Sequence, residues 1–188
     1  DGDLEAFALR YSTVQKQIKA LQEEASLENF INLAFSFMVA GLYTQAEKLL
    51  DKAESVCGKS AGIEYSRADL QINKGNTDKG MQIYESLCLN QSLDPSFRAQ
   101  IYLQIGEIWL FRRADDKALD CFNRALELDP LQGDARLQRA RINSAKREFH
   151  GLEEDLQNLQ APGINWVFPR NQESAPELIA ALSRNLKN

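Results

Sequence analysis

Residues 102–130 read YLQIGEIWLFRRADDKALDCFNRALELDP, and this stretch decides the fold class. Small and large apolar residues recur in it at the three- and four-residue spacing of two helices joined by a short turn. These positions are Tyr102, Ile105, Gly106, Trp109, Ala118, Phe122, Ala125 and Pro130. Gly106 and Ala118 allow two antiparallel helices to approach closely, while Trp109 and Phe122 fill the volume beside them. The stretch therefore predicts one helix-turn-helix unit.

The same pattern occurs twice earlier in the chain, at a constant spacing. Ala34 and Ala68 hold the small position of a first helix, and Ala46 and Gly80 hold that of a second helix. The spacing then lengthens, because the next small residue of the second-helix kind is Ala118. We expect the extra residues to form a loop between the second and third units.

Two local features add detail to the repeat pattern: a predicted helix start in the third unit and polar replacements in the second. Asp94-Pro95 predicts an N-cap followed by proline at the first helical position of the third unit. In the second unit Arg67 and Gln71 replace apolar residues of the pattern. We therefore expect the second unit to depend on its neighbours for stability.

These residues and spacings resemble the tetratricopeptide repeat. The resemblance implies an all-α fold, a right-handed α-solenoid of stacked helix pairs with an N-terminal helix and a C-terminal capping region. We expect repeats at residues 27–60, 61–94 and 99–132, and a degenerate fourth repeat at 133–160. The resemblance also implies that the chain holds another polypeptide.

Amphipathic segments flank the predicted array. Residues 1–26 predict a helix with one apolar stripe, which either packs on the first repeat or pairs with a second copy of the chain. The stripe consists of Phe7, Tyr11, Val14, Ile18 and Leu21. In the segment 161–188 a capping box from Ser174 to Glu177 predicts a short helix over 175–187. The apolar tail around Trp166 either covers the last repeat or meets a partner.

Charged residues of the fourth unit predict solvated surfaces. The first set is basic and consists of Arg136, Arg139, Arg141, Lys146 and Arg147. The second is the acidic run Glu153-Glu154-Asp155, which we expect at the solvated start of a helix, where the helix dipole favours carboxylates.

The resemblance implies that a concave groove lined by the first helices binds a peptide. Threading the family's groove positions onto this chain gives a mostly apolar floor with a few charges. The predicted groove residues are Ile31, Phe35, Met38, Tyr65, Asp69, Ile72, Leu103, Glu107, Leu110, Phe111 and Arg141. The basic clamp that binds heat-shock chaperone tails is absent, because its positions hold Ile31, Phe35, Ser66, Gln100 and Gln104. An apolar or amphipathic segment suits this groove better.

Composition excludes several functional classes. The net charge of −5 argues against nucleic acid, and no apolar run is long enough to insert into a membrane. The single His150 has no metal-site or nucleophile–base pattern around it, so we expect no enzyme activity, no metal and no cofactor. Cys57, Cys88 and Cys121 suggest small buried thiols in a soluble cytoplasmic protein. A Cys57–Cys88 bridge and export after signal removal stay open, because the chain begins with Asp1 rather than methionine.

The sequence favours a non-catalytic scaffold, adaptor or assembly factor. Two alternatives remain: a substrate-holding chaperone that resembles the small acidic chaperones of bacterial secretion systems, and the recognition domain of a larger enzyme. We expect the partner to be another protein or a peptide segment, and a homodimer through the N-terminal helix or the groove stays open.

Overall fold

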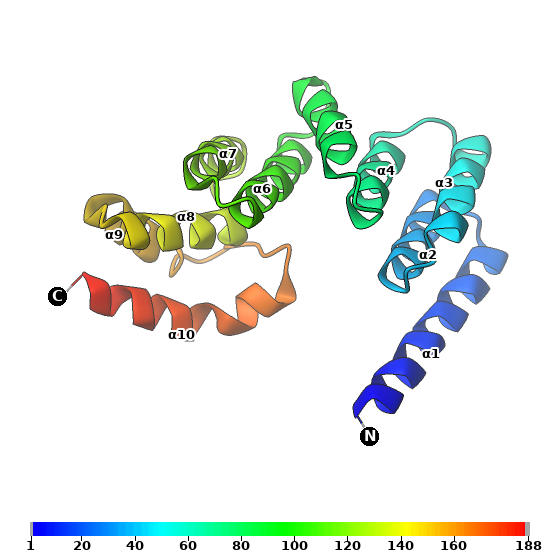
Figure 1. The fold of residues 1–188 in the computed structure, drawn as a ribbon, viewed down its shortest axis with the longest axis horizontal. Helices are drawn as coiled ribbons and strands as arrows, with labels where there is room; N and C mark the ends of the chain where they lie inside the picture. The colour runs from blue at the N-terminus through cyan, green and yellow to red at the C-terminus, as the bar shows by residue number, and fades with distance from the viewer. Residues whose placement is uncertain (1, 187–188) are drawn as a thin grey trace. The chain divides into compact units, whose positions relative to one another are not determined.

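The computed structural model describes the backbone of residues 2–186 and the side chains of 12–168 and 171–186. The described part is helical, with one isolated bridge between Gln132 and Asn165 and no strand (Figure 1). Its ten helices are α1 (Gly2–Glu23), α2 (Leu27–Val39), α3 (Tyr43–Cys57), α4 (Ala61–Asn73), α5 (Thr77–Leu89), α6 (Pro95–Phe111), α7 (Asp115–Leu128), α8 (Gly133–Lys146), α9 (Phe149–Asn158) and α10 (Pro169–Asn185). The predicted all-α arrangement of consecutive helix pairs is confirmed for this part of the chain.

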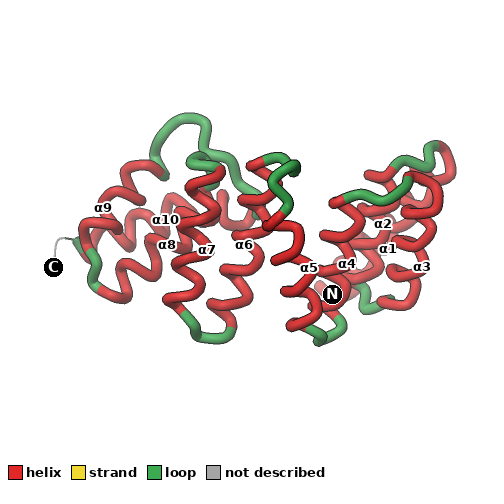
Figure 2. The backbone as a smooth tube through the Cα atoms, turned by 90° about the horizontal axis from the view of Figure 1, so that it is seen from above, coloured by secondary structure: helices red, strands yellow, loops and turns green. Residues whose placement is uncertain are grey.

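The helices form two compact units, Asp1–Leu89 and Asn90–Asn188, which are considered separately below. Unit 1 holds the pairs α2/α3 and α4/α5 and the leading helix α1. Unit 2 holds the pairs α6/α7 and α8/α9 and the final helix α10. Short turns join the two helices of each pair, and the longest connection, residues 159–168, leads from α9 to α10 (Figure 2).

In unit 1, local capping and turn residues set the helix ends. Ser26 and Ser60 accept hydrogen bonds from the backbone amides of the first turns of α2 and α4. Gly41 and Gly75 follow the ends of these helices with φ of 74° and 85°, a conformation that glycine adopts without strain.

The core of unit 1 is built from small residues opposite large ones. A Cβ on Gly80 would lie 2.8 Å from the backbone oxygen of Ala68, so α4 and α5 approach as closely as the pattern predicts. Helix α1 packs on the first repeat: Leu21 contacts the cluster around Phe30, and Asn29 donates to the carbonyls of α1 residue Ala20 and of Glu24. Of the predicted α1 stripe, the Phe7 and Tyr11 side chains lie outside the described residues.

In unit 2 the predicted packing of α6 on α7 is confirmed. Asp94 caps α6 by accepting from the amides of Ser96 and Phe97. A Cβ on Gly106 would lie 2.5 Å from the fully buried ring of Phe122, so only glycine fits there. The other small positions, Ala118 and Ala125, are fully buried, as are Ala34, Ala46 and Ala68 of unit 1.

Trp109 and Pro130 are less buried than the core positions around them. Trp109 is half-buried, and Arg112 and Lys117 stand over its ring at 5.4 and 4.2 Å from the centroid. Pro130 is exposed after the end of α7. Trp109 therefore forms the margin of the core instead of filling its centre.

The predicted solvated faces of α8 and α9 are partly wrong. Asp155 is 0% exposed and accepts hydrogen bonds from the guanidinium groups of Arg136 and Arg139, at 3.3 and 2.6 Å. Burial raises the pKa of Asp155, while the two arginines oppose that shift. The α8–α9 contact therefore contains a buried ion-pair network, which the pattern of single charges did not reveal.

The prediction for the last helix is also corrected: α10 begins at Pro169, not near residue 175, and Pro176 lies inside it. The cause is a tertiary contact. Asp134, fully buried at the start of α8, accepts hydrogen bonds from the backbone amides of Val167 and Phe168 and from the Asn171 side chain. These contacts fix the chain just before α10 and in its first turn, so the capping box is not needed to start the helix.

The cysteines form no disulfide in the described part of the chain. Cys88 is buried and Cys121 is half-buried, but Cys57 is exposed at the end of α3, so the prediction of a buried thiol is wrong there. Cys57 is the last residue of α3, and its thiol lies 3.7 Å from the carbonyl oxygen of Ala25 between α1 and α2.

Candidate functional site

The first helices of unit 1, α2 and α4, present an apolar face. Ile31 of α2 contacts Gly62 of α4 so closely that a Cβ on Gly62 would lie 3.1 Å from Cδ1 of Ile31. One and two turns further along α2, the side chains of Phe35 and Val39 are 57% and 56% exposed. We define the first-helix face of unit 1 as Ile31, Phe35, Val39, Tyr65 and Asp69.

Asp69 supplies the charge of this face. The Tyr84 hydroxyl of α5 donates a hydrogen bond to the Asp69 carboxylate, and the Tyr84 and Tyr65 rings lie 5.2 Å apart. Burial raises the pKa of Asp69 to about 6, although the tyrosine hydrogen bond opposes the shift. Near neutral pH the group is mostly ionised, so it can accept hydrogen bonds or attract a cation at the margin of the apolar face.

Of the other two predicted groove residues of unit 1, Met38 is buried and Ile72 is half-buried. Met38 is 3% exposed and packs with Ala34, Ala46 and Leu50, so its assignment to the groove is wrong. Ile72 is half-buried, and its Cγ1 would lie 2.5 Å from a Cβ on Gly80, so part of its side chain packs on α5. Met38 therefore lies in the core, whereas Ile72 packs on α5 and stays partly exposed.

In unit 2 the predicted groove residue Leu103 lies in the buried core, and the chain's own tail packs against that core. Leu103 is 0% exposed, and Val167 and Phe168 pack against the cluster that contains it. The assignment of Leu103 to an open groove is therefore wrong. A small cavity of about 270 Å³ remains where the first turns of α6 meet the tail, lined by Ser96, Phe97, Gln100, Asp129, Gln132, Asn165, Trp166 and Val167.

The other predicted groove residues of unit 2 divide into two sets. Glu107 accepts a hydrogen bond of 2.7 Å from Gln138, whose side-chain oxygen in turn accepts from the exposed Arg141 at 3.4 Å. Burial raises the pKa of Glu107, and the bond from Gln138 opposes the shift. Leu110 packs half-buried against the core, whereas Phe111 is 90% exposed.

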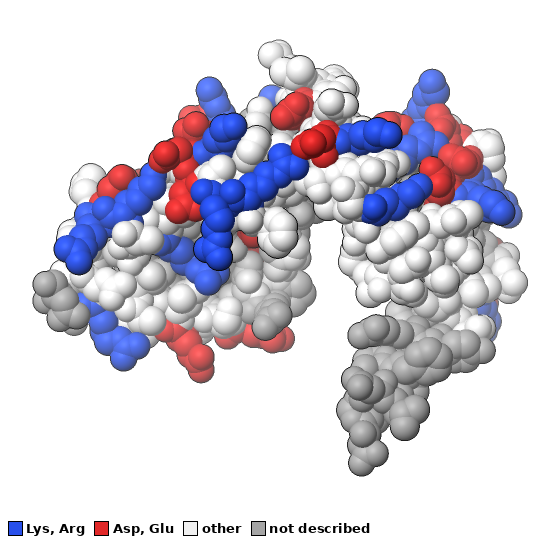
Figure 3. All heavy atoms as spheres, in the orientation of Figure 1, with Lys and Arg blue, Asp and Glu red and all other residues white. Residues whose placement is uncertain are grey.

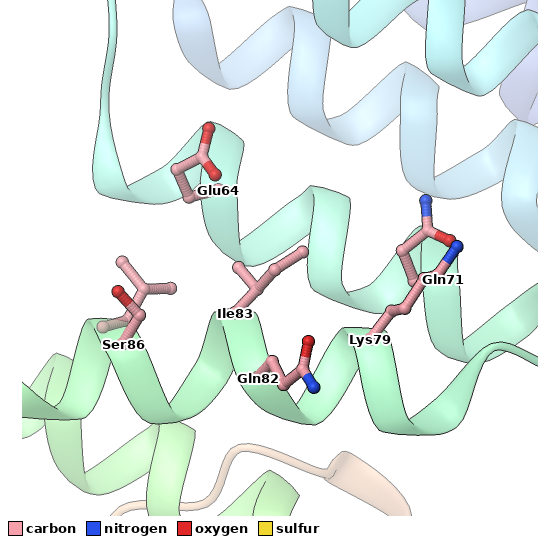
Figure 4. Close-up of a pocket in the computed structure, with 7 residues that line it drawn as sticks. Glu64, Gln71, Lys79, Gln82, Ile83 and Ser86 are labelled. Atoms are coloured by element: carbon pink, nitrogen blue, oxygen red, sulfur yellow. The ribbon is translucent and has the colours of Figure 1, made fainter.

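A polar cleft in unit 1 was not predicted from the sequence. It has a volume of about 450 Å³ and lies along α4 and α5 (Figure 4). Its lining residues are Glu64, Gln71, Lys79, Gln82, Ile83, Ser86 and Leu87. The sequence contains an indication of this cleft, because the polar Gln71 replaces the aromatic residue that the first and third units have at the equivalent position, Phe37 and Trp109.

Arg67 explains how the second repeat is held beside this cleft. Its guanidinium pairs with Asp51 and Glu54 of α3 at 3.0 and 2.6 Å and with Glu64 at 2.9 Å. Burial alone would lower the pKa of Arg67, but these hydrogen bonds raise it. The expected support from a neighbouring repeat is thus electrostatic at this position.

The described residues contain no group of three or more His, Cys, Asp or Glu side chains placed to hold a metal ion. No helix in the described part of the chain is long and apolar enough to cross a membrane.

Comparison of the chain with known proteins identifies its fold. No family model matches the sequence, and no curated protein matches it significantly. Solved structures match well: BtubC from P. vanneervenii has a TM-score of 0.64 at 17% identity, covering 95% of this chain and 82% of that one. PilF of Pseudomonas aeruginosa has a TM-score of 0.63 at 16% identity, covering 98% and 88%. MamA has a TM-score of 0.54 at 14% identity, covering 87% and 89%.

These neighbours are tetratricopeptide-repeat proteins, and at such identities their similarity concerns the fold alone. The helix pairs, the small residues at their contacts and these structural matches agree, and the chain has the tetratricopeptide-repeat fold.

Proposed function

We propose that this protein is a non-catalytic interaction module whose first-helix face of unit 1 binds an apolar or amphipathic segment of another protein. One observation carries the proposal: Phe35 and Val39 are more than half exposed on the same side of α2 as Ile31. Burying a side chain of this size contributes about 1.5–3 kcal/mol before the cost of ordering the partner.

The charge on this face suggests how a partner is oriented. Asp69 lies on α4, beside Tyr65, and is bonded to Tyr84. A lysine, arginine or free backbone amide on the bound segment would give this carboxylate a second hydrogen bond. The expected ligand therefore combines large apolar side chains with a donor group near one end.

Unit 2 illustrates the type of segment that such a repeat accepts. Its own tail places Val167 and Phe168 against the cluster containing Leu103, and an amphipathic helix follows directly. An extended apolar stretch or an amphipathic helix from a partner would use the same kind of contact on unit 1.

Selection from a random peptide library displayed on phage tests the proposal with the intact protein. We expect enriched peptides with large apolar residues at helical or alternating spacing, and at least tenfold weaker binding to Phe35→Glu. Val56→Glu is the matched control, because Val56 is 53% exposed on the second helix α3. Peptides that bind both variants equally would overturn the proposal. Loss of a self-association by Phe35→Glu alone would identify a second copy as the occupant.

We also propose a cytoplasmic location, where the exposed Cys57 would stay reduced. A substrate-holding chaperone would use the same face. A chaperone differs from a scaffold in that its partner protein would be unstable when expressed alone.

A further inference from the structure

Two arginines occupy turn positions where unit 1 has glycine. Gly41 and Gly75 hold the same place in successive repeats and end α2 and α4 with positive φ. Arg113 and Arg147 are likewise one repeat apart, and they follow α6 and α8 with φ of 59° and 60°. The same turn is thus made by glycine in unit 1 and by arginine in unit 2.

The turn itself does not require arginine. A left-handed conformation brings the Cβ of a non-glycine residue close to its own backbone, and the strain persists only where something else compensates it. Within the described residues, neither Arg113 nor Arg147 pairs with a carboxylate. No ion pair within the described residues therefore explains why arginine stands at these two turns, so we look for a role toward something outside the chain.

Both turns lie on the same side of unit 2, opposite the long loop that leads into α10 (Figure 2). An ion pair between Lys146, at the end of α8, and Asp116, in the first turn of α7, joins them. Arg112 and Lys117 are held over the Trp109 ring at the first turn. Figure 3 shows basic side chains on the visible face of unit 2, interspersed with acidic ones.

We define the basic edge as Arg112, Arg113, Lys117, Lys146 and Arg147. Three carboxylates accompany these five cations, Asp115, Asp116 and Glu148, so the edge is positive on a chain whose net charge is −5. Two phenylalanines project beside the turns, Phe111 at 90% and Phe149 at 43% exposure.

A small polar cavity opens at the same edge. It has a volume of about 360 Å³ and is lined by Ser144, Arg147, Phe149 and Asn185. Asn185 donates a hydrogen bond of 2.9 Å to the Ser144 hydroxyl. A guanidinium, a hydroxyl and an amide are suitable donors for phosphate oxygens.

We propose that the basic edge of unit 2 docks on an anionic lipid surface, with Arg113 and Arg147 at the phosphate headgroups and Phe111 and Phe149 in the interfacial region. A protein partner would need a complementary pocket for a phenylalanine that projects from a turn. A lipid interface accepts such a side chain without one. Basic residues near anionic lipid each contribute about a fivefold gain in affinity, and added salt weakens the attraction.

Flotation with vesicles tests this proposal. We expect the full chain to bind vesicles of phosphatidylglycerol and phosphatidylcholine, and not vesicles of phosphatidylcholine alone. Arg113→Gly with Arg147→Gly removes two charges while keeping the turns, and should weaken binding about ten- to thirty-fold without lowering the melting temperature. Phe111→Ser with Phe149→Ser should also weaken binding.

Matched controls separate this edge from general effects. Lys48→Gln with Lys52→Gln removes two exposed cations from α3, and Phe35→Ser removes an exposed aromatic ring from α2. Both control variants should bind vesicles within twofold of the parent. Because Phe35 lies on the first-helix face, this outcome does not depend on whether that face binds peptides. The proposal is wrong if the arginine variant binds like the parent. It is also wrong if polyglutamate binds the edge and anionic vesicles do not, since an acidic polypeptide would then be the partner.

Discussion

Asp69 provides the charge of the first-helix face, but its burial disfavours the ionised carboxylate. Its carboxyl group has a pKa of about 6 in the folded protein and 3.8 as the reference value. The folded state therefore holds this proton more tightly than the unfolded state does. The contribution of Asp69 to stability is highest below pH 4 and is lost as the pH rises through about 6.

Replacing Asp69 with asparagine tests this electrostatic assignment. The amide oxygen can still accept from the Tyr84 hydroxyl but carries no charge, so we expect Asp69→Asn to be more stable than the parent by on the order of 2 kcal/mol at pH 7. The two proteins should be nearly equal at pH 4. Urea unfolding at both pH values measures the difference. A stability difference that does not change with pH would show that the charge of Asp69 is not responsible.

Two glycines of the first helices should respond oppositely to an added methyl group. Gly106→Ala forces a contact with the buried Phe122 ring and should cost about 1–3 kcal/mol. Gly62→Ala meets only the flexible end of Ile31, and alanine favours a helix by about 1 kcal/mol, so it should be neutral or stabilising. Thermal unfolding of both variants gives the comparison, and an equal loss in both would contradict the described packing.

For single residues, the sequence predicted which small and large side chains are in contact, but not how deeply each side chain is buried. Gly106 and Phe122 meet as the spacing indicated. Met38 and Leu103 are buried instead of exposed, because each lies in a cluster built with residues of other helices, and tail residues also pack against the cluster of Leu103. The spacing of apolar residues along one helix does not show whether residues far away in the sequence bury them.

At the scale of elements, the docking of the tail on α8 depends on one buried carboxylate. Asp134 accepts from two backbone amides and from the Asn171 side chain, and Ile164 and Trp166 pack over Gly133 beside it. Gly133 also donates to the Asn165 carbonyl at 2.8 Å. The start of α8 is therefore the anchor for everything that follows residue 163.

Asp134→Ala should release this segment. Three donors would lose their acceptor, at a cost on the order of 3 kcal/mol, and amide hydrogen exchange across α10 should accelerate. Glu177→Ala is the control, because Glu177 is an exposed member of the predicted capping box. If amide exchange in α10 accelerates equally in both variants, the capping box also stabilises this helix. If it accelerates in neither, the apolar contacts hold the segment on α8 without Asp134.

Helix existence was more predictable than helix boundaries for a physical reason. The pairs α2/α3 to α8/α9 follow from apolar periodicity, which is local. The start of α10 depends on Asp134, and the buried pairing of Asp155 with Arg136 and Arg139 joins two helices. Single charged residues on a helix look solvated until their partners are known.

At the scale of the whole molecule, the repeats divide into two units with different surfaces. Unit 1 leaves apolar side chains of its first helices exposed, whereas in unit 2 the tail packs over the corresponding cluster and the turns carry arginine. The longer spacing between the second and third repeats falls across the boundary at Leu89 and Asn90. The two proposed surfaces, for peptide and for lipid, thus belong to different units.

The most direct measurement of the central claim is a photocrosslink at the first-helix face. Purified protein with p-benzoyl-phenylalanine in place of Phe35 is illuminated in a native extract, and the same residue in place of Val56 serves as the control. We expect a discrete adduct with a polypeptide at position 35 and none at position 56, with the attached segment rich in large apolar residues. Equal labelling at both positions, or an adduct only with the protein's own residues 164–186, would contradict the claim that unit 1 receives a partner there.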